Sequence, residues 1–158
     1  MAAYIKFDGV DGECLEKEHK AWSPLASFGQ GLHQPGGGAT GATRRRGDVI
    51  LDDLTCSKEL DKASPKIAES VCKGKVYPKV EIDVTASDAG RVTYYRYELK
   101  NVLVTSYNIS GSGQAEDVPM EDFTLNFEEI KVTYTENDNA GKKKGNIEYS
   151  WKVEEGES

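Results

Sequence analysis

The sequence predicts an all-β fold with one short α-helix, in which two sheets form a β-barrel and a long glycine-rich loop leaves the domain. From residue 80 onward, apolar and polar residues alternate with a period of two, the side-chain period of a β-strand. Only residues 64–74 have the start and stop signals of a helix. Residues 34–47 contain almost no side chain that packs in a core, so they predict the extended loop.

The predicted strands of the C-terminal half are separated by clear turn signals. After the turn at residues 87–90, residues 91–109 predict either one long bent strand or two, with the bend at Asn101. Residues 110–114 and 137–145 are the next two breaks, and the phase shifts at Glu128 and Glu129. The alternating apolar residues of these strands are Val80, Ile82, Val84, Phe123, Leu125, Phe127, Ile130, Val132, Tyr134, Ile147, Tyr149, Trp151 and Val153.

The N-terminal half shows fainter strand signals, at residues 3–7, 21–32 and 49–54, followed by the one helix. Ser64 is the predicted N-cap, Pro65 occupies the first helical position, and Gly74 ends the helix. The face predicted to pack on the core consists of Ile67, Ala68, Val71 and Cys72. A single domain over residues 1–154, followed by a solvated tail at 155–158, accounts for the whole chain.

The glycine-rich segment is predicted to be an arm that becomes ordered on a neighbouring subunit. Gly36, Gly38 and Gly41 match G-x-G-x-x-G, but no amphipathic helix follows, so no helix N-terminus is available for a phosphate. The three arginines are predicted to pair with acidic positions of a neighbour, such as Asp52, Asp53 or Glu81. The residues predicted at this subunit interface are Gly36, Gly37, Gly38, Thr40, Thr43, Arg44, Arg45 and Arg46.

Charge and composition narrow the class of partner. The 158 residues have a formal net charge of −7, which disfavours nucleic acid and acidic membranes and favours protein partners. Neither a membrane-spanning run nor an export signal is present in the sequence, so we expect no membrane insertion and no cleaved signal peptide. The odd number of cysteines, Cys14, Cys56 and Cys72, and the lack of C-x-x-C spacing predict reduced thiols.

No residue pattern predicts catalysis, a metal or a cofactor. His19 and His33 are the only histidines, and neither has a nucleophile or carboxylate pattern around it, so both are predicted at the surface. The adjacent acidic pairs, such as Asp52 with Asp53, would point to opposite faces of a strand. We therefore expect a protein that is not an enzyme.

Several segments in this order resemble the haemolysin-coregulated protein family. They are Tyr4 to Gly9, the glycine-rich arm, the helix with Lys75 to Lys79 after it, Tyr97 to Ser106, the Ser110–Gly113 break, Thr124 to Phe127, and Tyr149 to Trp151. Nearly the whole chain takes part. The triple arginine is not a feature of the family as a whole.

The resemblance implies the tube subunit of a bacterial type VI secretion system. Members form β-barrels that close into hexameric rings, stack into the tube driven by a contractile sheath through a spike, and carry, protect and export effectors. The implied location is the cytoplasm before firing and the outside of the cell afterwards. An early serine of the family faces the lumen and affects effector loading. By position it corresponds to Ser27, although Ala26 stands where the family has an aromatic residue.

Two other classes of function are compatible with a β-rich chain. A monomeric β-barrel that binds a small ligand or carbohydrate would use Tyr94, Tyr95, Tyr97 and Tyr107 as a stacking surface. Cross-strand packing explains the same tyrosines, because aromatic residues are enriched in strands without any ligand. An enzyme would require a cleft with a perturbed acid or base, and the sequence offers no such constellation.

Overall fold

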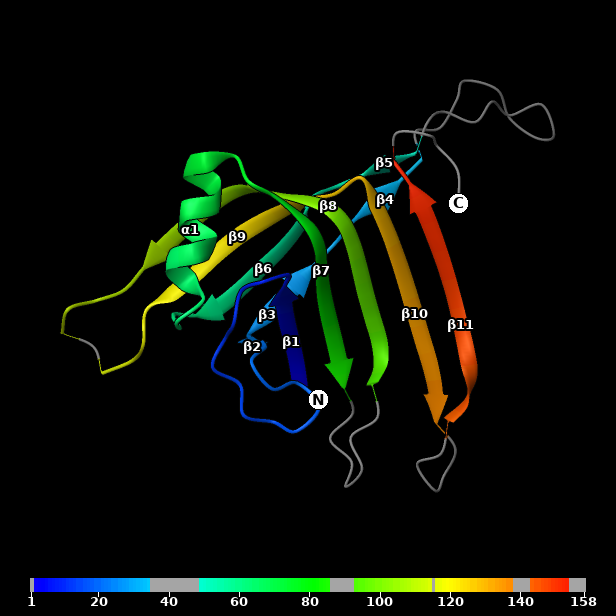
Figure 1. Cartoon of the computed structure of the whole chain (residues 1–158), viewed down its shortest axis with the longest axis horizontal. Coiled ribbons are helices and arrows are strands. Elements are labelled where there is room, and N and C mark those ends of the chain that lie inside the picture. The colour runs from blue at the N-terminus through cyan, green and yellow to red at the C-terminus, as the bar shows by residue number, and fades with distance from the viewer. Residues whose placement is uncertain (1, 35–48, 86–92, 115, 138–142, 154–158) are drawn as a thin grey trace.

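The structure is a computed structural model that describes residues 2–34, 49–85, 93–114, 116–137 and 143–153. Most of the predicted arm, all its interface residues and the tail at 155–158 lie outside the described residues. Figure 1 shows the arrangement of the described elements. Their bounds are β1 Ala2–Phe7, β2 Ser23–Leu25, β3 Ser27–Gly29, β4 Leu32–His33, β5 Ile50–Leu51, β6 Leu54–Glu59, α1 Ser64–Lys73, β7 Val76–Thr85, β8 Thr93–Ser110, β9 Met120–Asn126, β10 Glu129–Asn137 and β11 Lys143–Lys152.

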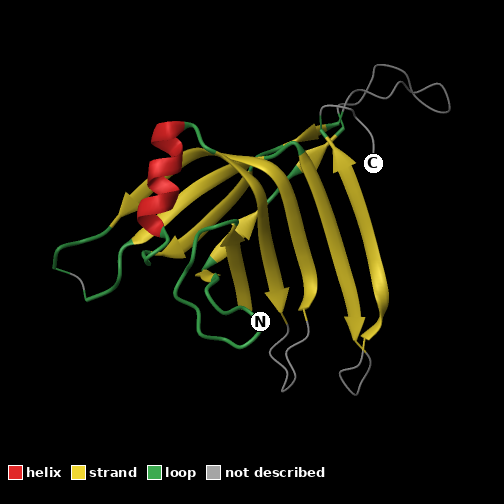
Figure 2. Cartoon of the chain, viewed as in Figure 1, coloured by secondary structure: helices red, strands yellow, loops and turns green. Residues whose placement is uncertain are grey.

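The described strands form one large sheet and one small sheet (Figure 2). The large sheet has nine strands in the order β2-β1-β7-β8-β9-β6-β3, with β10 and β11 branching from β8; β4 and β5 form the other sheet. On one side, β8 pairs with β7. On the other side, its first half pairs with β10 and its second half with β9. Helix α1 lies over the end of the molecule opposite β11 (Figure 1).

Residues 23–29 connect the two edges of the large sheet. At one end β2 pairs with β1, and at the other end β3 pairs with β6. Between them, the amide of Ala26 donates to the carbonyl of Ser57 at 2.8 Å. The all-β class with one short helix is therefore confirmed for the described residues, and its strands do not form a continuous hydrogen-bonded ring. Residues 23–29 instead connect the β1 edge of the sheet to the β6 edge.

The long strand β8 is one strand that bends at Asn101. Leu99 and Val102 are both fully buried, so the inward phase shifts by one residue between them. Asn101 absorbs the shift with a φ of 51°, a left-handed conformation that asparagine tolerates better than most residues. Its side-chain amide donates to Glu128 at 2.9 Å, where β9 passes into β10. The predicted bend at Asn101 and the predicted phase shift at Glu128 therefore lie side by side in the fold.

The helix is confirmed over Ser64–Lys73, but two of its predicted details are wrong. Gly74 ends it in the left-handed conformation, as predicted. Ser64 is not the N-cap: that position is Ala63, whose amide donates to Asp61, while the hydroxyl of Ser64 bonds into the core. Cys72 is exposed because the buried stripe follows Ile67 and Ser70.

Candidate functional site

Four neighbouring strands, β3, β6, β9 and the second half of β8, present two rows of small polar residues on their outward face. We call this surface the polar face. From β3 to β8, the backbone pairing aligns Ser27, Ser57, Asp122 and Asn108 in one row, and Gly29, Thr55, Thr124 and Ser106 in the other. Inward neighbours such as Cys56 and Phe123 belong to the core, because successive side chains alternate. The polar face includes Ser27, which is exposed in the subunit.

The polar face is slightly hollowed, and hydrogen bonds hold two carboxylates on it or at its margin. A shallow depression of about 340 Å3 lies on it, lined mostly by hydroxyl-bearing residues of both rows. Asp122 accepts a hydrogen bond from the hydroxyl of Ser57. At the margin, Asp53 accepts from Thr105 at 2.8 Å and from Asn126 at 2.9 Å. Both carboxylates are therefore held in place by uncharged donors, which leaves their negative charge uncompensated on this face.

A buried ionic cluster supports the polar face from beneath. Lys58, which is fully buried, contacts Glu121 and lies 2.8 Å from Asp61. Ser64 donates to Glu121 at 2.9 Å, and the hydroxyl of Tyr107 also donates to Glu121. Burial, and then the bond to Glu121, raise the pKa of Tyr107. The cluster joins β6, β8, β9 and the start of α1, so it fixes the helix on the inner side of this end of the sheet.

At the other end of the sheet, part of the core-side surface of β10 and β11 is exposed. Ile130 and Val132 are buried, but farther along the hairpin Tyr134, Ile147 and Tyr149 are 40%, 71% and 45% exposed. Tyr134 pairs with Ile147 across the strands, so the three side chains share one surface, which we call the apolar hairpin face. Contiguous exposed apolar groups of this kind mark interaction sites.

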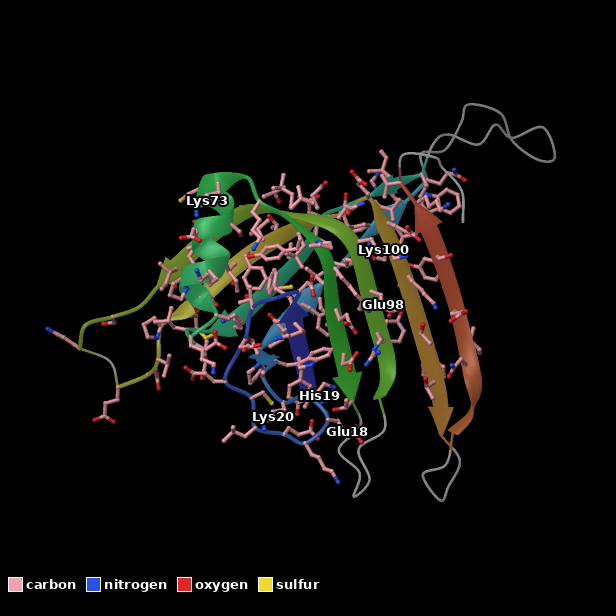
Figure 3. All side chains as sticks on the ribbon, viewed as in Figure 1. Glu18, His19, Lys20, Lys73, Glu98 and Lys100 are labelled. Atoms are coloured by element: carbon pink, nitrogen blue, oxygen red, sulfur yellow. The ribbon has the colours of Figure 1, made fainter. Side chains whose placement is uncertain are left out.

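The opposite surface of β7, β8, β10 and β11 is covered by paired charges. Asp83 receives two hydrogen bonds from the guanidinium of Arg96, at 2.6 and 2.8 Å, and these bonds are the main reason that the pKa of Arg96 is raised. Figure 3 shows Glu98 and Lys100 farther along β8. The remaining pairs are Lys79 with Glu81 and Glu98, Arg96 with Glu81, Lys100 with Glu129, and Lys131 with Glu98 and Glu148. We call this surface the ion-pair face.

His19 is buried, so its predicted surface position is wrong. Its two ring nitrogens lie 2.5 Å from a carboxylate oxygen of Glu16 and 2.8 Å from one of Asp83. The ring of Tyr4 stacks on it, with centroids 4.2 Å apart. In Figure 3, His19 lies beside the ends of β1 and β7. The group ties the segment before β2 to the sheet, and its carboxylates are occupied by structural contacts. His33 is exposed, as predicted.

The tyrosines proposed as a stacking surface mainly pack on the core. Tyr97 is 9% exposed and makes edge contacts with Tyr95 and Phe28 at centroid distances of 5.3 and 5.8 Å. Tyr107 bonds to the buried Glu121, and the side chain of Tyr94 lies outside the described residues. Cross-strand packing is therefore the better interpretation of this set.

The three cysteines are free, as predicted. Burial raises the pKa of the Cys56 thiol, which disfavours its reactive thiolate form. In the described part of the chain, no three His, Cys, Asp or Glu side chains are grouped to hold a metal ion. The described helix is not long and apolar enough to cross a membrane.

Comparison with known proteins identifies the family. A family described as "Type VI secretion system effector, Hcp" matches residues 4–134. Protein hcp1 of Pseudomonas aeruginosa is 32% identical over 152 residues, which are 95% of this chain and 93% of that protein. The chain belongs to the Hcp family of type VI secretion proteins. The resemblance seen in the sequence is thereby confirmed.

Solved structures agree with the Hcp assignment. A structure described as a type six secretion system protein has a TM-score of 0.91 and 28% identity, and covers 99% of this chain and 98% of its own. Hcp1 from Salmonella typhimurium has a TM-score of 0.80 at 24% identity, covering 99% and 97%, and so supports the fold alone. Hcp proteins are type VI tube and effector components, and the strand arrangement described above is that of an Hcp fold.

Sequence reasoning missed two features of this Hcp chain. The sequence did not distinguish the apolar hairpin face from a core face, because Tyr134, Ile147 and Tyr149 continue the same alternation as the buried Val132. Periodicity shows which residues share a face but not whether another element covers it. The contact between His19 and Asp83 joins positions 64 residues apart, for which the sequence has no local signal.

Proposed function

We propose that this Hcp chain is a structural subunit of the type VI secretion inner tube. Six copies close into a ring, the rings stack into the tube, and the lumen carries and protects effector proteins during export. The other partners are the spike protein and the contractile sheath. The subunit stays in the cytoplasm until firing, is then secreted without a cleaved signal peptide, and acts by assembly instead of catalysis.

The observation that carries this proposal is the apolar hairpin face. Tyr134, Ile147 and Tyr149 expose large apolar side chains on one surface of a two-strand extension. Burying them against a neighbour is favourable by about 25 cal/mol for each Å2 removed from water. A ring requires a patch that meets a different patch on the next copy, and the hairpin supplies one of the two.

The glycine-rich arm supplies a second contact in this proposal. In the sequence it connects β4 to β5, in which Leu32 and Ile50 are 53% and 45% exposed. Glu81 is already paired with Lys79 and Arg96 of its own subunit, whereas Asp52 is exposed. We therefore favour Asp52 of the neighbour as the partner of the arginines at 44–46. In the ring, Gly36, Gly37, Gly38, Thr40 and Thr43 also contact the neighbouring subunit.

Light scattering at several protein and salt concentrations tests the assembly. Six copies of the 17.4 kDa chain give about 104 kDa. Ile147→Lys places a charge on the apolar hairpin face and is expected to reduce the mass to that of one subunit. Ser150→Lys is the matched control, because it adds the same charge to the same strand on the ion-pair face. Equal effects of the two variants would argue against the hairpin as an interface.

A strict monomer of the unmodified chain at all concentrations would instead favour the ligand-binding alternative. The depression beside Ser27 would then be the place to look for a small polar ligand. The buried state of Tyr97 and the core contact of Tyr107 weigh against a carbohydrate platform built from these tyrosines.

A further inference from the structure

We propose that the polar face selects basic segments of the cargo protein, which it binds through Asp122 and Asp53. The proposal rests on the proposed function, because it takes the polar face as the wall that cargo meets. It adds the chemical class of the surface that this wall binds, namely polypeptide bearing lysine or arginine side chains.

The sign of the charge on the polar face supports this class. Among the described residues, no lysine or arginine occupies an outward position on β3, β6, β9 or the second half of β8. The charged side chains there are Glu59 and Asp122, and Asp53 lies at the margin, just before β6. Lys58 points inward, is fully buried, and is already paired with Glu121. The described residues of the polar face therefore give it a negative field, because none of them is a cation that would cancel these charges.

The ion-pair face of the same subunit shows that this is not a property of the whole surface. There, Lys79, Lys131 and Arg96 alternate with Glu81, Glu98 and Asp83, so each charge has an opposite neighbour. Paired charges of this kind leave little field for a partner to meet. The described residues of the polar face, in contrast, include carboxylates but no lysine or arginine beside them.

The hydrogen-bonding capacity of the polar face points the same way. The hydroxyl of Ser57 is already donated to Asp122, and that of Thr105 to Asp53. An ionised carboxylate only accepts, and each can accept several bonds. A partner must therefore donate, and ammonium and guanidinium groups are the charged donors of proteins. An apolar cargo surface would leave these carboxylates desolvated without a partner.

The geometry favours loose and reversible binding. The two rows contain serine, threonine, glycine, asparagine and aspartate, and none of these residues has a side chain large enough to wall a deep pocket. Individual exposed ion pairs are weak. Repeating the same face around a ring adds many weak contacts, which hold a cargo firmly only while the ring is intact.

The experiment measures binding of a fluorescent peptide of repeating Lys-Gly-Ser to the full-length protein, by anisotropy at low and raised salt. Asp122→Asn keeps the acceptor for Ser57 and removes the charge. Glu148→Gln removes the same charge from the ion-pair face. We expect Asp122→Asn to weaken binding of the peptide about threefold. Glu148→Gln, the control, should leave the binding nearly unchanged. A Glu-Gly-Ser peptide is expected not to bind.

Equal weakening by the two variants would show that only net charge matters and would overturn the proposal, as would tighter binding of the Glu-Gly-Ser peptide. Ser27→Lys places a cation in the first row and should weaken binding of the Lys-Gly-Ser peptide. Ser150→Lys, on the ion-pair face, should weaken it less.

Light scattering of the same samples separates the two proposals. A monomer with loss specific to Asp122→Asn would refute the ring and leave the basic-cargo preference standing. A ring without that loss would do the reverse.

Discussion

The polar face and the apolar hairpin face lie at opposite ends of the long strand β8 and differ in what they present to water. The polar face consists of small hydrogen-bonding residues over a core that α1 completes from the other side. The apolar hairpin face is the core-side surface of β10 and β11, where covering elements have ended. One sheet therefore has one surface that water solvates well and another that it solvates poorly.

This difference separates two kinds of contact. Burying the exposed side chains of Ile147 and Tyr149 lowers the free energy of the system, so the contact that covers them is expected to be permanent. Ser57 and Asp122 lose water as they gain a partner, and the net gain is small. A subunit that must assemble stably yet release its cargo requires both kinds of surface.

The largest effect is expected from breaking the support of the polar face. Lys58→Met leaves the buried carboxylate of Glu121 without its cation, and losses of about 3–5 kcal/mol are typical of such changes. Urea unfolding measures the loss, and hydrogen exchange should show it first in β6 and β9, before the β10–β11 hairpin. Lys66→Met on the exposed side of α1 is the control. Similar losses in both variants would contradict the supporting role of the cluster.

The next effect distinguishes the covered and uncovered parts of the hairpin. Ile130 is fully buried, so Ile130→Ala should cost roughly 2–5 kcal/mol in the free energy of unfolding. Ile147→Ala should cost less than about 0.5 kcal/mol in the isolated subunit, because that side chain is 71% exposed, yet it should lower the oligomer mass. Urea unfolding at low concentration and light scattering at high concentration check the two parts. An equal cost at both positions would mean that Ile147 is covered within the subunit.

Lowering the pH should destabilise the part of the fold next to α1, because it protonates Asp61. Burial, the largest single influence, would raise its pKa, but hydrogen bonds from Lys58 and Ser23 together hold that pKa below the usual range. Asp61 therefore adds stability above its unfolded pKa of about 3.9, and this stability is lost as pH falls through the lower folded value. In unfolding experiments, the difference between the unmodified chain and Asp61→Asn should narrow below pH of about 4. The exposed Asp52→Asn should show no such narrowing if the effect is local.

The smallest effect is expected on the ion-pair face. Lys131 lies 3.5 Å from Glu148 and 4.0 Å from Glu98 and is 45% exposed. Lys131→Ala should reduce stability by only about 0.2–1 kcal/mol, and added salt should shrink the difference. Unfolding at low and high salt measures both. A salt-independent loss would indicate that the aliphatic part of Lys131 matters more than its charge.

Features fixed by neighbouring residues were predictable from the sequence. The strand alternation, the bend at Asn101 and the helix stop at Gly74 depend on local backbone preferences, and all three are confirmed. The assignments of Ser64 and His19 failed because each side chain bonds to a distant segment. That of Cys72 failed because the buried stripe of α1 follows Ile67 and Ser70.

By itself, the sequence determined which residues share a face, where strands end, and the Hcp family to which the chain belongs. Only the tertiary structure decided which faces are covered. It placed Ser27, Ser57, Asp122 and Asn108 in one row, and it left Tyr134 and Ile147 without a cover. The physical reason is that side-chain alternation is a local property of the backbone, whereas burial depends on segments that are far apart in the chain.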